Sequence, residues 1–175
     1  VADISRLTVD ARYVSIDGTR RYLMKTADGY PVETVFIPSE KRDTICFSSQ
    51  SGCPLKCDFC LTAKLGLLRN LTAGEIASQV RILAHETGLA RAAFNIVLMG
   101  MGEPLANFEN SVAALKLMLD DNAYGLSRRR VTITTSGLAP QLLRIADETN
   151  VALAVSLHAP NDELRSELVP INRRH

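Results

Sequence analysis

A strand-like run followed by a helical pattern recurs four times after residue 43, and this alternation constrains the fold more than any other feature. The apolar runs occupy residues 44–48, 94–99, 131–134 and 151–157. The helical patterns begin near Thr72, Asn107, Pro140 and Asn161. Thr72-Ala73-Gly74-Glu75 is a capping box, and Asn107 and Asn161 are predicted to cap their helices. Successive β/α units form parallel sheets with right-handed crossovers. The sequence therefore predicts an α/β fold, and specifically a partial (β/α) barrel.

The segment before this series has a different pattern. Alternating runs at residues 13–16, 21–24 and 32–37 are separated by the turn signals Asp17-Gly18 and Asp28-Gly29. Short alternating runs joined by such turns are typical of antiparallel hairpins. We therefore expect a small antiparallel β meander, and we divide the chain into an N-terminal extension (1–40) and a core (41–175).

Length and composition set broad limits. The chain has 175 residues, is 46% hydrophobic and carries a net charge of +1, which suits one globular domain with a sizeable core. It has no apolar run of membrane-spanning length and no signal peptide, so we expect no membrane association and a cytoplasmic location. It begins at Val1 without Met and stops at His175 without a terminating signal, so we expect a fragment or a processed chain.

Three of the four cysteines, Cys53, Cys57 and Cys60, have the spacing C-x-x-x-C-x-x-C. A closed structural zinc site needs four ligands, and a cubane iron–sulfur cluster is usually held by four thiolates. Three thiolates leave one metal position open to a further ligand. The spacing favours a 4Fe–4S cluster, and it is that of the radical S-adenosylmethionine (SAM) enzymes, in which SAM chelates the open iron.

Other interpretations of the cysteines have different strengths. A disulfide framework does not suit a chain with so few cysteines and a normal core composition. A Cys3His zinc site stays open, although none of the three histidines lies at finger-like spacing from the cysteines. The fourth cysteine, Cys46, lies in a strand-like run and is predicted to be a small buried hydrophobe.

Longer motifs make the resemblance more specific. Gly100-Met101-Gly102-Glu103-Pro104 follows one β/α unit after the cysteine loop and resembles the radical SAM motif that binds the SAM amino group; its two glycines would let the backbone approach a ligand closely. The later runs are residues 129–137, 156–160, 164–165 and 169–173. The cysteine loop, the glycine motif and these later runs occur in the same order in the RlmN/Cfr family of radical SAM RNA adenine methyltransferases. The chain resembles this family from about Val32 to its last residue.

The resemblance implies a role for each matching residue. Cys53, Cys57 and Cys60 would ligate a 4Fe–4S cluster, and an electron from the cluster would cleave SAM to a 5′-deoxyadenosyl radical. The implied SAM-binding residues are Gly102, Glu103, Thr134, Ser156, Leu157 and His158. Thr134 stands where the family often has Ser, and it keeps the hydroxyl. Glu33, in the run E-T-V-F-I-P, would accept the proton that leaves the modified carbon. Without the family, Thr134, His158 and Glu33 would be read as ordinary strand residues.

The predicted function is methylation of C2 of an adenine in 23S rRNA, and possibly in tRNA, with an electron donor such as flavodoxin. Alternatives are methylation at C8, another radical SAM reaction, and a zinc-stabilised RNA-binding module without catalysis. The family mechanism needs a methyl-carrying cysteine near the C-terminus, and no cysteine follows Cys60. We therefore expect this chain by itself not to methylate RNA. The basic run Arg128–Arg130 is read first as a solvated cluster and only second as an RNA contact.

Overall fold

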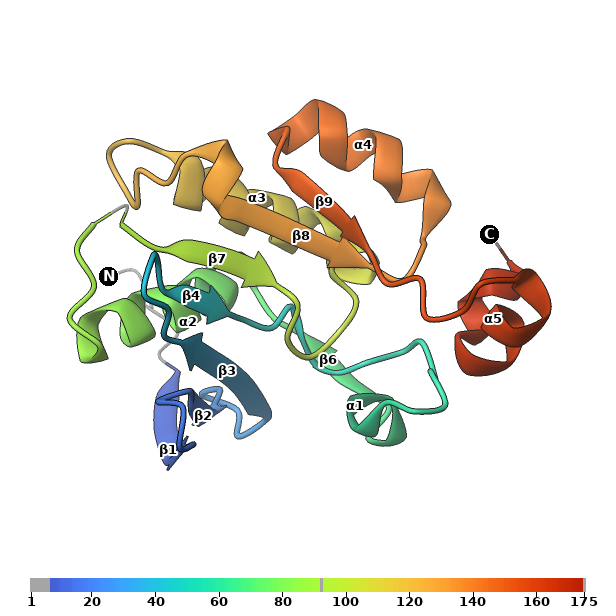
Figure 1. Ribbon diagram of the computed structural model, residues 1–175, viewed down its shortest axis with the longest axis horizontal. Helices are drawn as coiled ribbons and strands as arrows, with labels where there is room; N and C mark the ends of the chain where they lie inside the picture. The colour runs from blue at the N-terminus through green and yellow to red at the C-terminus, as the bar shows by residue number, and fades with distance from the viewer. Residues whose placement is uncertain (1–6, 92, 175) are drawn as a thin grey trace.

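A mixed seven-stranded sheet organises the chain (Figure 1). The computed structural model describes residues 7–91 and 93–174. In spatial order the strands are β1 (Thr8–Val14), β2 (Arg20–Lys25), β3 (Pro31–Ile37), β4 (Thr44–Cys46), β7 (Asn95–Leu98), β8 (Val131–Thr135) and β9 (Ala152–Val155). The first four pair antiparallel in sequence order, and β4, β7, β8 and β9 pair parallel.

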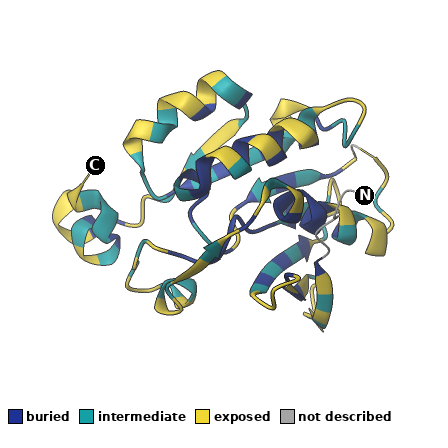
Figure 2. Cartoon of the chain, turned by 180° about the vertical axis from the view of Figure 1, so that it is seen from behind, coloured by how far each residue is buried: buried dark blue, intermediate teal, exposed yellow. Residues whose placement is uncertain are grey.

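Three helices connect the parallel strands. They are α2 (Ala73–Glu86), α3 (Phe108–Leu119) and α4 (Ala139–Thr149). Each parallel strand after β4 is added at the same edge of the sheet, so right-handed crossovers bring the helices to one face, where α2 packs on α3 and α3 on α4 (Figures 1 and 2). Such a one-sided arrangement is the wall of a β/α barrel. The predicted α/β fold with a partial barrel and an antiparallel meander is confirmed.

Shorter elements complete the chain. A two-stranded sheet pairs β5 (Gln50–Gly52) with β6 (Leu67–Asn70), and the sequence patterns did not predict it. The short helices are α1 (Leu61–Lys64) and α5 (Asp162–Leu168), together with the 3-10 turns η1 (Pro104–Asn107), η2 (Arg128–Arg130) and η3 (Pro170–Arg173). None of the helices within residues 7–91 and 93–174 is long and apolar enough to cross a membrane.

The meander shares both sheet and core with the parallel strands. Val35 of β3 pairs with Cys46 of β4, and Tyr22, Met24 and Val32 belong to the same buried hydrophobic cluster as the parallel strands and helices. Cys46 itself is half-buried. The division at residue 40 stays a prediction, whereas the packing of the two segments against each other is direct.

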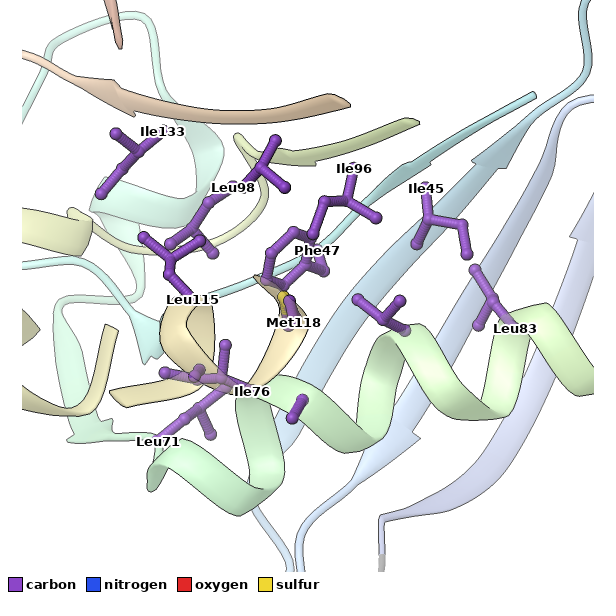
Figure 3. Packing of buried hydrophobic residues seen from close by; sticks show 14 of the residues in the cluster. Ile45, Phe47, Leu71, Ile76, Leu83, Ile96, Leu98, Leu115, Met118 and Ile133 are labelled. Atoms are coloured by element: carbon purple, nitrogen blue, oxygen red, sulfur yellow. The ribbon is translucent and has the colours of Figure 1, made fainter. Parts of the chain in front are cut away.

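The core lies between the sheet and its helices (Figure 3). Ile45, Ile96, Leu98 and Ile133 project from the strands toward Ile76 and Leu83 of α2 and Leu115 and Met118 of α3. All of these side chains are at most 1% exposed. Fully burying one such side chain contributes about 1.5–3 kcal/mol. The opposite face of the sheet is more open, because Ile37 is 40% exposed and Met99 at the end of β7 is 45% exposed.

Local signals in the sequence fix several helix ends. The predicted capping box is present, since Glu75 N donates to Thr72 Oγ1 at 3.2 Å and Thr72 N donates to Glu75 Oε2 at 2.9 Å. Asn161 caps α5 through the Leu164 amide at 3.0 Å. Asn107 precedes α3 as predicted, but its side chain does not cap the helix. Its amide group instead donates to the Ser49 carbonyl at 2.8 Å, so a tertiary contact displaces the expected local one.

Candidate functional site

A cavity opens where the loops at the carboxyl ends of β7, β8 and β9 meet the cysteine loop. Its volume is about 250 Å³. It is lined by all three clustered cysteines and by five of the six predicted SAM-binding residues, which are Gly102, Glu103, Thr134, Ser156 and His158. Residues from four separate segments thus converge where parallel β/α folds place their chemistry.

The cysteine loop is closed at its base by the small hairpin. Gly52 ends β5 with φ +78°, and a Cβ there would lie 1.9 Å from the Gly66 carbonyl oxygen, so only glycine fits. The Cys53 amide then donates to the same carbonyl at 3.0 Å. On the far side of the loop, the Asp58 amide donates to the Leu168 carbonyl of α5 at 3.0 Å. The loop is therefore held from two sides while its thiols face the cavity.

The three thiols differ in burial. Cys53 is 8% exposed, whereas Cys57 and Cys60 are half-buried. Burial raises the pKa of Cys53 to about 11. Burial also raises the pKa of Cys57, with smaller contributions from Cys60 and Glu103, while Arg165 acts in the opposite direction. A bound metal cation reverses this preference because it stabilises the thiolate.

The glycines of Gly100-Met101-Gly102 have a packing role that the sequence did not indicate. A Cβ on Gly100 would lie 2.8 Å from the Phe47 carbonyl oxygen, and one on Gly102 would lie 2.6 Å from the Gln50 Cβ. Both glycines therefore allow the loop after β7 to pack closely on the segment after β4. Both glycines also line the cavity, and their role in the approach of a ligand stays a prediction.

Glu103 is 2% exposed at the floor of the cavity. Its Oε2 accepts a hydrogen bond from the Ser136 amide at 2.8 Å, and its Oε1 accepts one from the Leu105 amide at 3.1 Å. Burial raises the pKa of this carboxyl, and the hydrogen bonds oppose that rise. Two backbone donors fix its orientation, so the carboxylate can meet a cationic group without rearranging.

Thr134 presents an unsatisfied polar atom. Its Oγ1 is buried and has no hydrogen-bond partner among the described residues, yet the residue lines the cavity. An unpaired buried hydroxyl costs free energy unless a partner is supplied. The hydroxyl is therefore available to a molecule bound in the cavity.

His158 has an unusual backbone conformation beside the cavity. Its φ is +61°, a left-handed value that is uncommon outside glycine. The imidazole ring packs against the ring of Phe59, with centroids 4.6 Å apart and planes inclined at 52°. Phe59 lies between Cys57 and Cys60, so this contact joins the loop after β9 to the cysteine loop.

Two predicted site residues lie outside the cavity lining. Leu157 is 62% exposed. Glu33 pairs with Arg21, whose Nη1 lies 3.5 Å from Glu33 Oε1. Because Val35 pairs with Cys46, whereas Phe36 of the core pairs with Ile45, the alternation of β3 places Glu33 on the face opposite the core.

That face is the one that also carries Thr134. Cys46 pairs with Val97, and Val97 pairs with Thr132, two residues before Thr134. Since β3 runs antiparallel to β4, the beginning of β3 lies at the edge where β4 ends. The register therefore places Glu33 on the open face, near the edge of the sheet where β4 ends.

Several organising residues escaped the sequence analysis. Gln50 accepts a hydrogen bond from the Glu103 amide at 2.8 Å, and Gln79 of α2 binds both the amide and the carbonyl of Ser48 at 2.8 Å. Ser136 and Phe59 line the cavity. Ser136 lies within the motif at residues 129–137 and Phe59 lies between Cys57 and Cys60, so the sequence motifs could have indicated both. No sequence signal indicated the roles of Gln50 and Gln79, because polar residues in a helix or strand usually face solvent.

Comparison with known proteins agrees with this geometry. Residues 47–175 match the model of the radical SAM superfamily. The fold is similar to the crystal structure of a radical SAM methyltransferase from Sphaerobacter thermophilus, with a TM-score of 0.92 and 45% identity over 97% of this chain. This chain spans 51% of that protein's chain. The family match, the shared fold and the cysteine-lined cavity agree, and the chain belongs to the radical SAM superfamily.

Proposed function

We propose that this chain is the cluster- and SAM-binding part of a methyltransferase that modifies C2 of an adenine in 23S rRNA and possibly in tRNA. The observation that carries the proposal is one cavity lined by three cysteines, an oriented buried carboxylate on Glu103 and an orphaned hydroxyl on Thr134. These groups match the ligands, the ammonium partner and the hydrogen-bonding partner that the family motifs imply.

The residues fit a 4Fe–4S cluster with SAM. Within residues 7–91 and 93–174, no three Cys, His, Asp or Glu side chains form a group that could hold one metal ion. A cubane cluster does not need its thiolates to converge on a single ion, because each thiolate ligates a different iron and the thiolates surround the cluster. Cys53, Cys57 and Cys60 line one cavity and would supply those thiolates. When bound, the cluster supplies the electron that cleaves SAM to a 5′-deoxyadenosyl radical.

The remaining residues orient the bound cofactor. Glu103 would accept hydrogen bonds from the SAM ammonium, since both its oxygens are already held by backbone amides. Thr134 Oγ1 would gain the partner that it lacks among the residues described by the structure. Ser156, Leu157 and His158 would border the adenosine end. Burial of Glu103 strengthens its attraction for a cation, because the local dielectric is low.

We propose adenine as the substrate because the order of the motifs resembles that of the RlmN/Cfr family and because the fold is similar to a radical SAM methyltransferase. Glu33 is proposed as the base that removes the proton from the modified carbon. It lies on the open face of the sheet, where an RNA base could approach, and its side chain is 41% exposed. An electron donor such as flavodoxin would reduce the cluster.

The cofactor part of the proposal is tested by anaerobic reconstitution. We expect iron and acid-labile sulfide at four atoms of each per chain and slow formation of 5′-deoxyadenosine when SAM and dithionite are added. Cys57→Ala should abolish both signals, and Cys46→Ala is the matched control that should keep both. Stoichiometric zinc without sulfide would instead support the non-catalytic module.

The substrate part is tested on cellular RNA. The 23S rRNA and tRNA from cells with and without the intact gene are digested to nucleosides and measured by mass spectrometry. Loss of 2-methyladenosine on deletion supports the proposal, and loss of 8-methyladenosine would assign the C8 alternative. Unchanged amounts of both would refute the RNA substrate while leaving the cofactor result standing.

A further inference from the structure

Arg165 of α5 is a buried cation beside the cavity, with a side chain that joins several loops. The residue is 9% exposed. Its Nη2 donates to the Ser136 carbonyl at 2.7 Å and its Nε donates to the Leu157 carbonyl at 3.1 Å. Its Nη1 donates to the Asn172 side chain. No salt bridge joins it to a carboxylate within residues 7–91 and 93–174, although buried charges are usually paired.

We infer that Arg165 is a positioning residue of the SAM site, which clamps the loops after β8 and β9 and supplies a positive charge to the cluster region. The inference rests on the proposed function. It assigns to one side chain two separable effects, one on SAM affinity and one on the reduction potential of the cluster.

The clamping effect follows from the backbone at His158. The Ala159 amide donates to the Leu157 carbonyl at 2.8 Å, which closes a three-residue turn around the left-handed His158. Such a turn is strained and persists only where its surroundings hold it. Arg165 Nε donates to the same Leu157 carbonyl. The guanidinium therefore stabilises the turn that sets the His158 ring against Phe59 of the cysteine loop.

The same side chain fixes the neighbouring strand end. Its Nη2 also lies 3.4 Å from the Ser156 carbonyl. The Ser136 carbonyl that it binds belongs to the residue whose amide donates to Glu103. One guanidinium thus restrains both the loop that orients Glu103 and the loop that would border the adenosine. A planar fork of five donors suits this task, and an ammonium does not reproduce it.

The charge effect follows from proximity to Cys57. The Ser136 and Ser156 carbonyls that Arg165 contacts belong to residues that line the same cavity as Cys57. The Asp58 amide, next to Cys57, also donates to the Leu168 carbonyl of the helix that carries Arg165. A reduced cluster carries one more negative charge than an oxidised one. A nearby cation without a carboxylate partner in the described part of the chain therefore stabilises the reduced state, and its removal should move the reduction potential to a more negative value.

The test uses the reconstituted protein and two readouts, the cluster midpoint potential from an EPR-monitored titration and the SAM dissociation constant. Arg165→Gln should shift the potential to a more negative value and weaken SAM binding roughly tenfold, comparable to the smallest losses of metal affinity or activity when an outer-shell partner of a metal site is removed. Arg165→Lys should keep the potential near that of the wild type but still weaken SAM binding. Arg144→Gln, at an exposed arginine paired with Glu109 and Glu148, is the matched control and should change neither readout.

Each Arg165 variant has a result that would contradict one of the two roles of this residue. Unchanged SAM affinity in Arg165→Lys overturns the clamp, and an unchanged potential in Arg165→Gln overturns the charge effect. If Arg165→Gln does not fold, Asn172→Asp tests the charge instead, because it sets a carboxylate against the guanidinium and should shift the potential in the negative direction. A wild-type protein without cluster or SAM binding would refute the proposed function, whereas normal wild-type behaviour with unaffected variants would refute only the role of Arg165.

Discussion

Replacing Gln79 by Met should destabilise the protein more than its helical position suggests. Gln79 is 0% exposed on α2, and its side chain holds the segment between β4 and the cysteine loop. Its Oε1 accepts from the Ser48 amide and from Thr34 Oγ1, both at 2.8 Å, and its Nε2 donates to the Ser48 carbonyl at 2.8 Å. Methionine has a similar shape but offers neither the donor nor an equivalent acceptor.

The magnitude follows from the groups left unpaired. The amide and the carbonyl of Ser48 lose their Gln79 partners inside the core, and each such loss costs about 1–3 kcal/mol. The Thr34 hydroxyl loses less, because Met24 Sδ at 3.9 Å remains as a weak acceptor. We therefore expect the free energy of unfolding to fall by about 3 kcal/mol, measured by urea denaturation with linear extrapolation.

The matched control is Gln141→Met. The Oε1 of Gln141 is buried and has no hydrogen-bond partner within the described residues, so the same substitution removes no acceptor bond there. We expect a change of less than about 0.5 kcal/mol. Equal destabilisation by the two substitutions would refute the argument that the Ser48 hydrogen bonds, rather than packing in general, make Gln79 important.

Three further changes test single contacts. Gly52→Ala should lower the free energy of unfolding by more than Gly29→Ala, because both have positive φ but only Gly52 faces a backbone oxygen at 1.9 Å; thermal denaturation compares them. Thr134→Val should not lower the stability of the unliganded protein, because its buried hydroxyl has no hydrogen-bond partner among the described residues; it should weaken SAM binding about fivefold, since one hydrogen bond contributes about 1 kcal/mol, and calorimetry at unchanged iron content checks this. Burial raises the pKa of Glu75, but hydrogen bonds from Arg69 and Thr72 outweigh it and the pKa lies below the ordinary 4.5. Its ionised form therefore stabilises the fold above about pH 4.5 and this contribution is lost as the pH falls further; Glu75→Gln should flatten the pH dependence of urea midpoints in that acidic range.

Features that depend on neighbouring residues in the chain were readable from the sequence. The capping box at Thr72, the cap at Asn161 and the β/α alternation each reflect hydrogen bonds or periodicity within a few residues. The spacing of Cys53, Cys57 and Cys60 likewise singled out three residues that line one cavity, because the ligands predicted for one cluster can come from one short loop. The predicted family and fold class followed from such local patterns.

Features that depend on distant segments were decided by the tertiary structure. The Asn107 side chain was predicted to cap a helix, but Ser49 and Leu71, far away in the sequence, provide acceptors at 2.8 Å. The glycines at 100 and 102 resemble ligand-binding glycines in sequence, while their Cβ positions are occupied by the segment after β4. A sequence pattern does not reveal which remote backbone will occupy a given space.

The positions of Glu33 and Arg165 show the same division. Sequence alone places Glu33 on a strand and Arg165 on a helix, where a charged residue is expected to face solvent. The antiparallel pairing of β3 with β4 brings Glu33 near the sheet edge where β4 ends, and the position of α5 beside the loops after β8 and β9 buries the Arg165 guanidinium among their carbonyls. The sequence determined which chemical groups the chain carries and which local elements they occupy. Strand register and loop packing decided which of those groups meet, because contacts between distant segments form only when the whole sheet is assembled.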